Sequence, residues 1–247
     1  MLPTQIIDFH VHFPAKQNMP RRKMHPLVQA YAKKLRDRWR QEYGFSEPET
    51  KNPGNDVQAE RWASEVKNNG LRKIVLMTGG GNETLAHYIT LYPDQFCGFA
   101  HHDLCEPDAL TKLKYALDEL HLVGYKWFGP RTTIPFESPA LKPFWTLLAE
   151  RRAPVLIHFG VLGGPGGTVH HPRINPLTLT EVAQAYPDIP FIIPHFGAGY
   201  FQELLHLAWS SPNIYIDTSG SNDWIKWCPY PLTLQDLFAK SLDTVGP

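Results

Sequence analysis

Apolar residues gather in seven short runs along the chain, and each run is four to eight residues long. Runs of this length, with little alternation of polar and apolar positions, are typical of strands that are buried on both faces of a parallel sheet. The predicted strands are residues 6–13, 73–77, 96–101, 123–128, 154–159, 190–196 and 214–217.

Segments with helical character separate these runs, for example residues 55–69, 107–120, 139–152 and 232–242. Strands and helices in alternation predict an α/β fold with a parallel sheet. The length of 247 residues suits a TIM-type (β/α)8 barrel, so we predict one barrel domain over residues 1–247. A doubly wound sheet is the alternative.

The segment over residues 27–43 interrupts this rhythm. Apolar side chains recur every fourth residue there and form one stripe at helical pitch, namely Leu27, Tyr31, Leu35, Trp39 and Tyr43. The segment is longer than a simple strand-to-helix connection, which predicts an inserted helix. We expect this helix to lie over the barrel mouth, against a partner subunit in a homodimer, or against the body of the barrel.

No eighth strand pattern follows residues 232–242. A barrel without that strand would expose two unpaired strand edges and part of its core. We therefore expect a (β/α)8-type barrel that lacks strand eight in this chain or closes in an unusual way.

Composition limits the classes of partner. Lys plus Arg and Asp plus Glu both number 24, so the chain has no net positive field that would attract nucleic acid or an anionic membrane. No apolar run approaches the roughly 18 residues of a membrane span. The three cysteines form no CxxC pair, which favours a reducing, cytoplasmic setting. A small-molecule substrate remains the expected partner.

The strongest chemical signal lies in the first predicted strand, where Asp8, His10 and His12 alternate with apolar residues. A period of two predicts that all three side chains point to the same side. Two neutral imidazoles from one strand restrict the position of a bound metal ion. Asp8 is then a candidate hydrogen-bond partner for a ligand histidine, or a structural residue.

Two further histidines close apolar runs. His158 ends the fifth predicted strand and His195 ends the sixth, and each is followed two residues later by glycine. The carboxyl ends of barrel strands share one mouth, so four histidines from three strands are predicted to meet there.

The histidine pair of the first strand, the closing His158 and the Pro-His-Phe-Gly sequence at residues 194–197 resemble the pattern of the amidohydrolase superfamily. They are most similar to the amidohydrolase-related branch that includes aminocarboxymuconate semialdehyde decarboxylase and related hydratases and lactone hydrolases. The resemblance covers essentially the whole chain. It implies a single divalent ion, commonly zinc, held by His10, His12 and His158, with His195 as an acid/base residue.

The branch has a further ligand, an aspartate after strand eight, and this chain ends before that position. Asp217 and Asp223, near the seventh predicted strand, are candidates to replace that carboxylate. Lys126 on the fourth predicted strand and Arg131 in the loop after it are candidates to bind a substrate carboxylate. A carbamylated Lys126 that bridges two metals is the alternative.

These features predict a metal-dependent hydrolase that acts on a small amide, ester, lactone or carboxylate through a metal-activated water. A non-oxidative decarboxylase of the same family needs the same metal and acid/base groups, so the sequence leaves it open. A non-catalytic barrel that binds a ligand is the alternative from another class, because the carboxylate after strand eight is absent.

Overall fold

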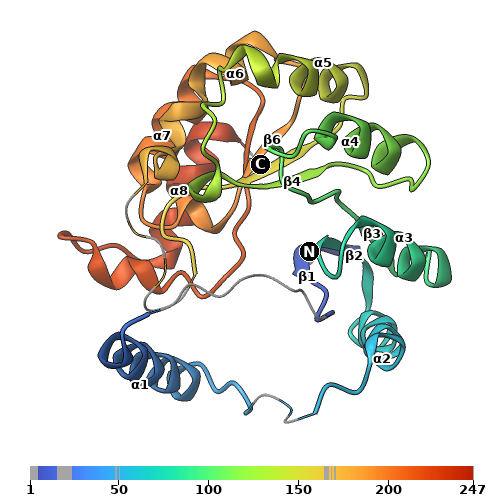
Figure 1. The fold of residues 1–247 in the computed structure, drawn as a ribbon. Coiled ribbons are helices and arrows are strands. Elements are labelled where there is room, and N and C mark those ends of the chain that lie inside the picture. The colour runs from blue at the N-terminus through green and yellow to red at the C-terminus, as the bar shows by residue number, and fades with distance from the viewer. Residues whose placement is uncertain are drawn as a thin grey trace.

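The computed structural model describes residues 5–15, 24–47, 49, 51–163, 167, 169 and 171–246 (Figure 1). All seven predicted strands are confirmed, with ends shifted by a few residues. They are β1 Ile6–His12, β2 Leu71–Thr78, β3 Phe96–Gly98, β4 Tyr125–Phe128, β5 Val155–His158, β6 Phe191–Ile193 and β7 Ile214–Ile216.

The strands pair in chain order, and every pair is parallel. One group contains β1 to β3 and the other β4 to β7, and a parallel bridge between Ala100 and Tyr125 joins them. A doubly wound sheet would reverse its strand order at a switch point, so the continuous order identifies a partial (β/α) barrel. Within the described residues, no strand follows the last helix or pairs with the outer edges of β1 and β7.

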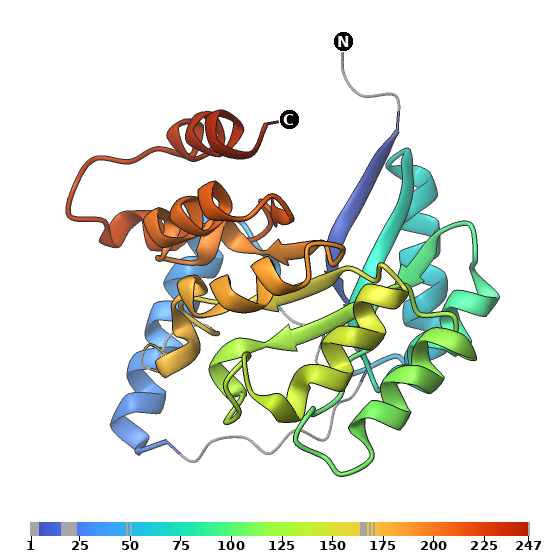
Figure 2. The same ribbon diagram turned by 90° about the horizontal axis from the view of Figure 1, so that it is seen from above.

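Helices cover the outside of the strands (Figure 2). They are α2 Asn55–Asn68, α3 Asn82–Leu91, α4 Ala109–Asp118, α5 Lys142–Glu150, α6 Thr180–Ala185, α7 Phe201–Ser210 and α8 Leu234–Val245. The largest core cluster fills the space between strands and helices, with Leu113, Trp145 and Leu204 almost completely buried. No helix in the described part of the chain is both long and apolar enough to cross a bilayer.

A second buried cluster fills the interior of the barrel. It consists of Val75, Met77, Phe99, Leu156 and Ile192, with Phe9 and Cys97 packed against it. Because these side chains plug the barrel, polar chemistry is confined to the mouth at the carboxyl ends of the strands.

A bulge in β1 changes which side chains face the interior. Asp8 pairs with Ile74 and Val11 with Leu76, so three steps along β1 match two along β2. The prediction that Asp8 shares a side with the two histidines is therefore wrong. Together with Val11, Asp8 lines a hollow of about 240 Å³ beside α2, away from the rings of the two histidines. Among the described residues, its carboxylate makes one hydrogen bond, in which Oδ1 accepts the backbone N–H of His10 at 3.3 Å.

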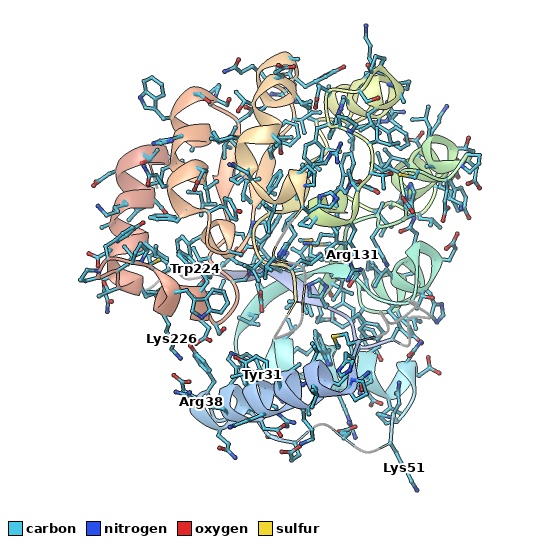
Figure 3. The ribbon with its side chains drawn as sticks, turned by 60° about the vertical axis from the view of Figure 1, so that its left-hand side comes forward. Tyr31, Arg38, Lys51, Arg131, Trp224 and Lys226 are labelled. Atoms are coloured by element: carbon cyan, nitrogen blue, oxygen red, sulfur yellow. The ribbon has the colours of Figure 1, made fainter. Side chains whose placement is uncertain are left out.

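The inserted helix is α1 Pro26–Glu42, close to the predicted residues 27–43. Its carboxyl end packs on the segment after β7, on the side of the molecule where Figure 3 labels Arg38 and Lys226. Trp39 Nε1 donates to Ser221 Oγ at 3.2 Å there, and Glu42 pairs with Lys226. Leu27 and Tyr31 keep 74% and 62% of their surface exposed. Among the described residues, the contacts of the stripe are at its carboxyl end, where Tyr43 still keeps 39% of its surface exposed. The homodimer remains a prediction.

One close approach fixes the loop after β5 against the loop after β6. A Cβ on Gly160 would lie 2.2 Å from Gly197 O and 2.4 Å from Ala198 O, and φ of Gly160 is +70°. We expect Gly160→Ala to lower the free energy of unfolding by about 2–5 kcal/mol through overlap and left-handed strain. Gly199→Ala is the matched control, because φ is +96° there with no atom within 4 Å, and it should cost about 1–2 kcal/mol. Urea unfolding measures both, and equal losses would contradict the close-approach argument.

Candidate metal centre

Four imidazole rings from three strands meet at the mouth of the barrel. His10 and His12 belong to β1, His158 ends β5, and His195 follows β6. Ring centroids lie 5.0 Å apart for His10 and His12, 5.0 Å for His10 and His195, and 5.1 Å for His158 and His195. The structure thus brings together all four histidines selected from the sequence.

His195 does not close strand β6 as predicted. The strand ends at Ile193, and His195 begins a short turn, His195–Gly197, with φ of +59° at His195 and +50° at Phe196. Pro194 cannot donate a backbone N–H and so cannot extend the ladder in the usual way. The left-handed turn is a strained conformation, and such strain is often found at functional sites.

Each of the three expected ligands has a partner on one ring nitrogen. His10 Nδ1 lies 2.7 Å from Asp217 Oδ2, His12 Nδ1 lies 2.7 Å from Thr78 Oγ1, and His158 Nε2 lies 3.0 Å from Val161 O. A carbonyl oxygen only accepts, so His158 donates through Nε2 and keeps its Nδ1 lone pair. Metal-binding histidines commonly donate their second nitrogen in this way, which fixes the ring.

The remaining nitrogens are Nε2 of His10, Nε2 of His12 and Nδ1 of His158. Neutral imidazole nitrogens are good ligands for zinc and related divalent ions, so the donor set fits such an ion. Among the described residues, no three His, Cys, Asp or Glu side chains already stand at metal-ligand spacing. The rings are therefore gathered and oriented, and binding requires them to move inward.

Loss of hydration keeps these rings neutral. It lowers the pKa of His12 to about 3, although part of His12 remains exposed, and the pKa of His195 to about 4. Burial also lowers the pKa values of His10 and His158, and the charge of Lys126 acts in the same direction on both. Neutral rings are the form that binds a metal ion, so no proton has to be removed from them at neutral pH.

Lys126 places a cation next to the donors. Its side chain is buried on β4, and Nζ lies 3.5 Å from His10 Nε2 and 4.8 Å from the centre of the Phe128 ring. Burial lowers the pKa of Lys126 to about 7, and the charge of Asp217 opposes this shift. Lys126 can therefore hold or release a proton near neutral pH.

A cavity of about 280 Å³ is separated from the four rings by Thr78 and Lys126, which contact His12 and His10 and also line the cavity. Its lining includes Thr78, His101, His102, Lys126, Phe128 and Arg131. The Arg131 guanidinium lies 5.1 Å from the centre of the Phe128 ring at the exposed rim. Phe128 is thus flanked by both cations, Lys126 at the buried end of the cavity and Arg131 at its entrance.

The two candidate replacement carboxylates have different surroundings. Asp217 is bonded to His10, whereas Asp223 lies 2.6 Å from Lys226 and accepts from Tyr43 at 3.3 Å, on the side where α1 packs. The prediction for Asp223 is therefore wrong, because the partners of its carboxylate are surface groups. Burial raises the pKa of Asp217, but the His10 contact and the Ser219 N–H outweigh it and keep that pKa low.

Thr78, His101 and Ser219 line or support the site and were not selected from the sequence. Each lies at, or within three residues of, the carboxyl end of a strand, namely β2, β3 and β7. The rule that selected the histidines could have found them, since strand ends share the mouth of a barrel. Thr78 and Ser219 gave no separate signal because Thr and Ser are common residue types, whereas His101 ends the predicted strand 96–101 just as His158 ends its own.

The amidohydrolase family model matches residues 7–247. The chain belongs to the amidohydrolase family. This family is typically metal-dependent, and its solved members include enzymes. No curated protein matches the sequence at a significant level.

Several solved structures share the fold of this amidohydrolase. A 2,6-dihydroxybenzoate decarboxylase complexed with 2,6-dihydroxybenzoate is 16% identical, with a TM-score of 0.63 over 99% of this chain and 86% of that one. A probable 2-pyrone-4,6-dicarboxylic acid hydrolase from Acinetobacter baumannii is 13% identical, with a TM-score of 0.55 over 98% and 92%. A 5-carboxyvanillate decarboxylase from Novosphingobium aromaticivorans with bound manganese is 12% identical, with a TM-score of 0.55 over 94% and 93%.

The neutral histidines make the stability of this amidohydrolase depend on pH. The His195 ring becomes protonated below about pH 6.5 in the unfolded chain but only below about pH 4 in the folded protein. The free energy of unfolding therefore falls as the pH falls from 6.5 to about 4. We expect the loss of unfolding free energy between pH 7 and pH 4.5 to be smaller in His195→Gln than in the wild type, by on the order of 1–3 kcal/mol. Urea unfolding of metal-free protein at pH 7 and pH 4.5 measures it. The exposed His206 supplies the control His206→Gln, and an unchanged pH dependence in His195→Gln would contradict the argument.

Proposed function

We propose that this amidohydrolase is a metal-dependent hydrolase that acts on a small ester, lactone, amide or other carboxylate-bearing substrate. In this proposal one divalent ion, with zinc expected first, is held by His10, His12 and His158. The observation that carries the proposal is the pairing of one nitrogen of each ring with Asp217, Thr78 or Val161, so that the opposite nitrogen is the one that would bind a metal. For His10 this is Nε2, which would exchange its contact with Lys126 Nζ at 3.5 Å for the ion.

A divalent ion, when bound, supplies the positive charge that polarises a substrate carbonyl and makes a water molecule more acidic. His195 supplies proton transfer. Its Nδ1 lies 3.0 Å from the backbone oxygen of Ser219, so the ring is held while Nε2 keeps its lone pair. A neutral imidazole of this kind can take a proton from the attacking water and return it to the leaving group.

The cavity beside the histidines accounts for the expected substrate class. Arg131 at its rim suits the two oxygens of a carboxylate, and Lys126 at its buried end adds a second positive charge. Phe128 between them offers a flat apolar surface to a planar group. These features favour a small, planar molecule that carries a carboxylate.

Non-oxidative decarboxylation is the second candidate, and the same cavity favours it. An aromatic carboxylate would stack on Phe128 while the cations bind its charged group. His195 Nε2 would take a proton from a water molecule and pass it to the ring carbon while the carboxylate leaves as carbon dioxide, which the remaining hydroxide can trap as bicarbonate. Two of the three compared proteins are decarboxylases of carboxylated aromatic rings by name, which supports this candidate.

The proposal is tested with metal-free protein reloaded with zinc or manganese and offered lactones, esters and carboxylated aromatics. We expect turnover only after reloading, and His195→Gln should lower kcat by about 10²–10⁴-fold. Arg131→Gln should raise KM for a carboxylate-bearing substrate by about 10–100-fold, as expected for loss of a charged hydrogen bond, and leave KM for its uncharged ester unchanged.

Release of carbon dioxide instead of an added water would select the decarboxylase. Saturable binding of carboxylated aromatics by reloaded protein, without turnover of any of them, would contradict both enzymes and favour the non-catalytic barrel. Equal KM changes for the acid and its ester would contradict the role of Arg131.

A further inference from the structure

One short segment after β7 contacts two of the four histidines. Residues 217–220 have the sequence Asp-Thr-Ser-Gly. Asp217 Oδ2 lies 2.7 Å from His10 Nδ1, and Ser219 Oγ lies 3.0 Å from both His10 Nδ1 and His195 Nδ1. A single hydroxyl therefore lies between the same nitrogen of two rings that belong to different strands.

The chemistry of the acceptors decides where the ring protons lie. The Asp217 carboxylate, whose other oxygen already accepts the Ser219 N–H, and the Ser219 backbone oxygen, 3.0 Å from His195 Nδ1, can only accept. Both rings must then carry their proton on Nδ1, and both keep a lone pair on Nε2. The Ser219 hydroxyl can share each of these protons, since it also accepts hydrogen bonds.

The segment is itself rigidly placed. The Ser219 N–H donates to Asp217 Oδ1 at 2.6 Å, so the two oxygens of this carboxylate have separate partners. The backbone of Asp217 also continues the β6–β7 ladder. Its N–H donates to Ile193 O at 2.9 Å, and its carbonyl oxygen accepts the Phe196 N–H at 3.2 Å. The strand that leads to His195 thereby holds the segment in register.

Gly220 leaves the room that the His195 ring needs. Its φ is +85°, and a Cβ at this position would lie 2.9 Å from His195 Nδ1. Any larger residue would push the ring away from Ser219 or strain the turn. Three of the four residues in the segment, Asp217, Ser219 and Gly220, thus contact the two imidazole rings or leave room for them.

We propose that residues 217–220 are a positioning segment that sets the tautomer and orientation of His10 and His195 together, so that both rings present Nε2 toward the mouth. The role of those Nε2 atoms in metal binding and proton transfer rests on the proposed function. The tautomers themselves exist without a metal or a substrate, and they can be measured in that state.

The first test is long-range ¹H–¹⁵N NMR of histidine-labelled, metal-free protein at pH 8, with the two rings assigned through His10→Gln and His195→Gln. We expect a pyrrole-type Nδ1 and a pyridine-type Nε2 for both rings in the wild type. Protons on Nε2 in either ring would overturn the proposal. This measurement needs no variant of the segment itself, so it stands even if such variants unfold.

The second test compares Ser219→Ala, Asp217→Asn and Gly220→Ala with Thr218→Ala, using circular dichroism to confirm folding. The Thr218 side chain has no hydrogen bond among the described residues, so it is the matched control within the segment. We expect a mixture of tautomers in at least one ring of the first three variants. Zinc binding should weaken by about 10–100-fold in Asp217→Asn, as is usual when the partner of a ligand histidine is changed.

Wild-type nitrogen shifts and zinc affinity in all three folded variants would overturn the proposal. Another outcome separates the two proposals. If each of the two rings carries its proton on Nδ1 in the wild type and this tautomer is lost in the variants, but neither the wild type nor any variant binds zinc or turns over a substrate, the positioning segment stands and the proposed function fails.

Discussion

The hydrogen bond between His10 and the buried carboxylate of Asp217 is the interaction on which the rest of the site depends. It joins the first strand to the seventh across the barrel mouth, where the two atoms lie 2.7 Å apart and both side chains are nearly inaccessible, at 2% and 7%. Without it, the carboxylate would be a buried charge without its main partner, and the His10 ring would be free to turn. The four neutral rings lose part of their hydration, and this site compensates by giving a nitrogen of each ring a fixed acceptor or hydroxyl.

The barrel supplies the geometry that this bonding needs. Parallel strands in unbroken order bring their carboxyl ends together, and the apolar plug formed around Met77, Phe99 and Leu156 keeps the polar groups at the mouth. The bulge in β1 turns Asp8 outward and leaves His10 and His12 on the inner side. The close approach of Gly160 to the loop after β6 then sets His158 beside His195. Lys126 and Arg131, on either side of Phe128, give the adjoining cavity its positive charge.

Hydrophobic patterning predicted the seven strands, the inserted helix and the four histidines, because buried parallel strands and their polar ends leave a local signal. Three features had no such signal. The bulge depends on how β1 pairs with β2, so a simple period of two misplaced Asp8. The turn at His195 depends on left-handed backbone angles that follow Pro194. The carboxylate of Asp217 contacts His10 across the barrel mouth, whereas that of Asp223 contacts Lys226 at the surface, and spacing along the chain does not reveal this difference.

The central claim is that His10, His12 and His158 form a metal site, and the metal content of the purified protein tests it most directly. The comparison is between wild type, the His10→Ala and His158→Ala double variant, and His206→Gln as an exposed control. The account predicts about one tightly held divalent ion per chain in the wild type and in the control, and none in the double variant. A wild type that holds no ion even after incubation with zinc or manganese, or a double variant that keeps its ion, would contradict it.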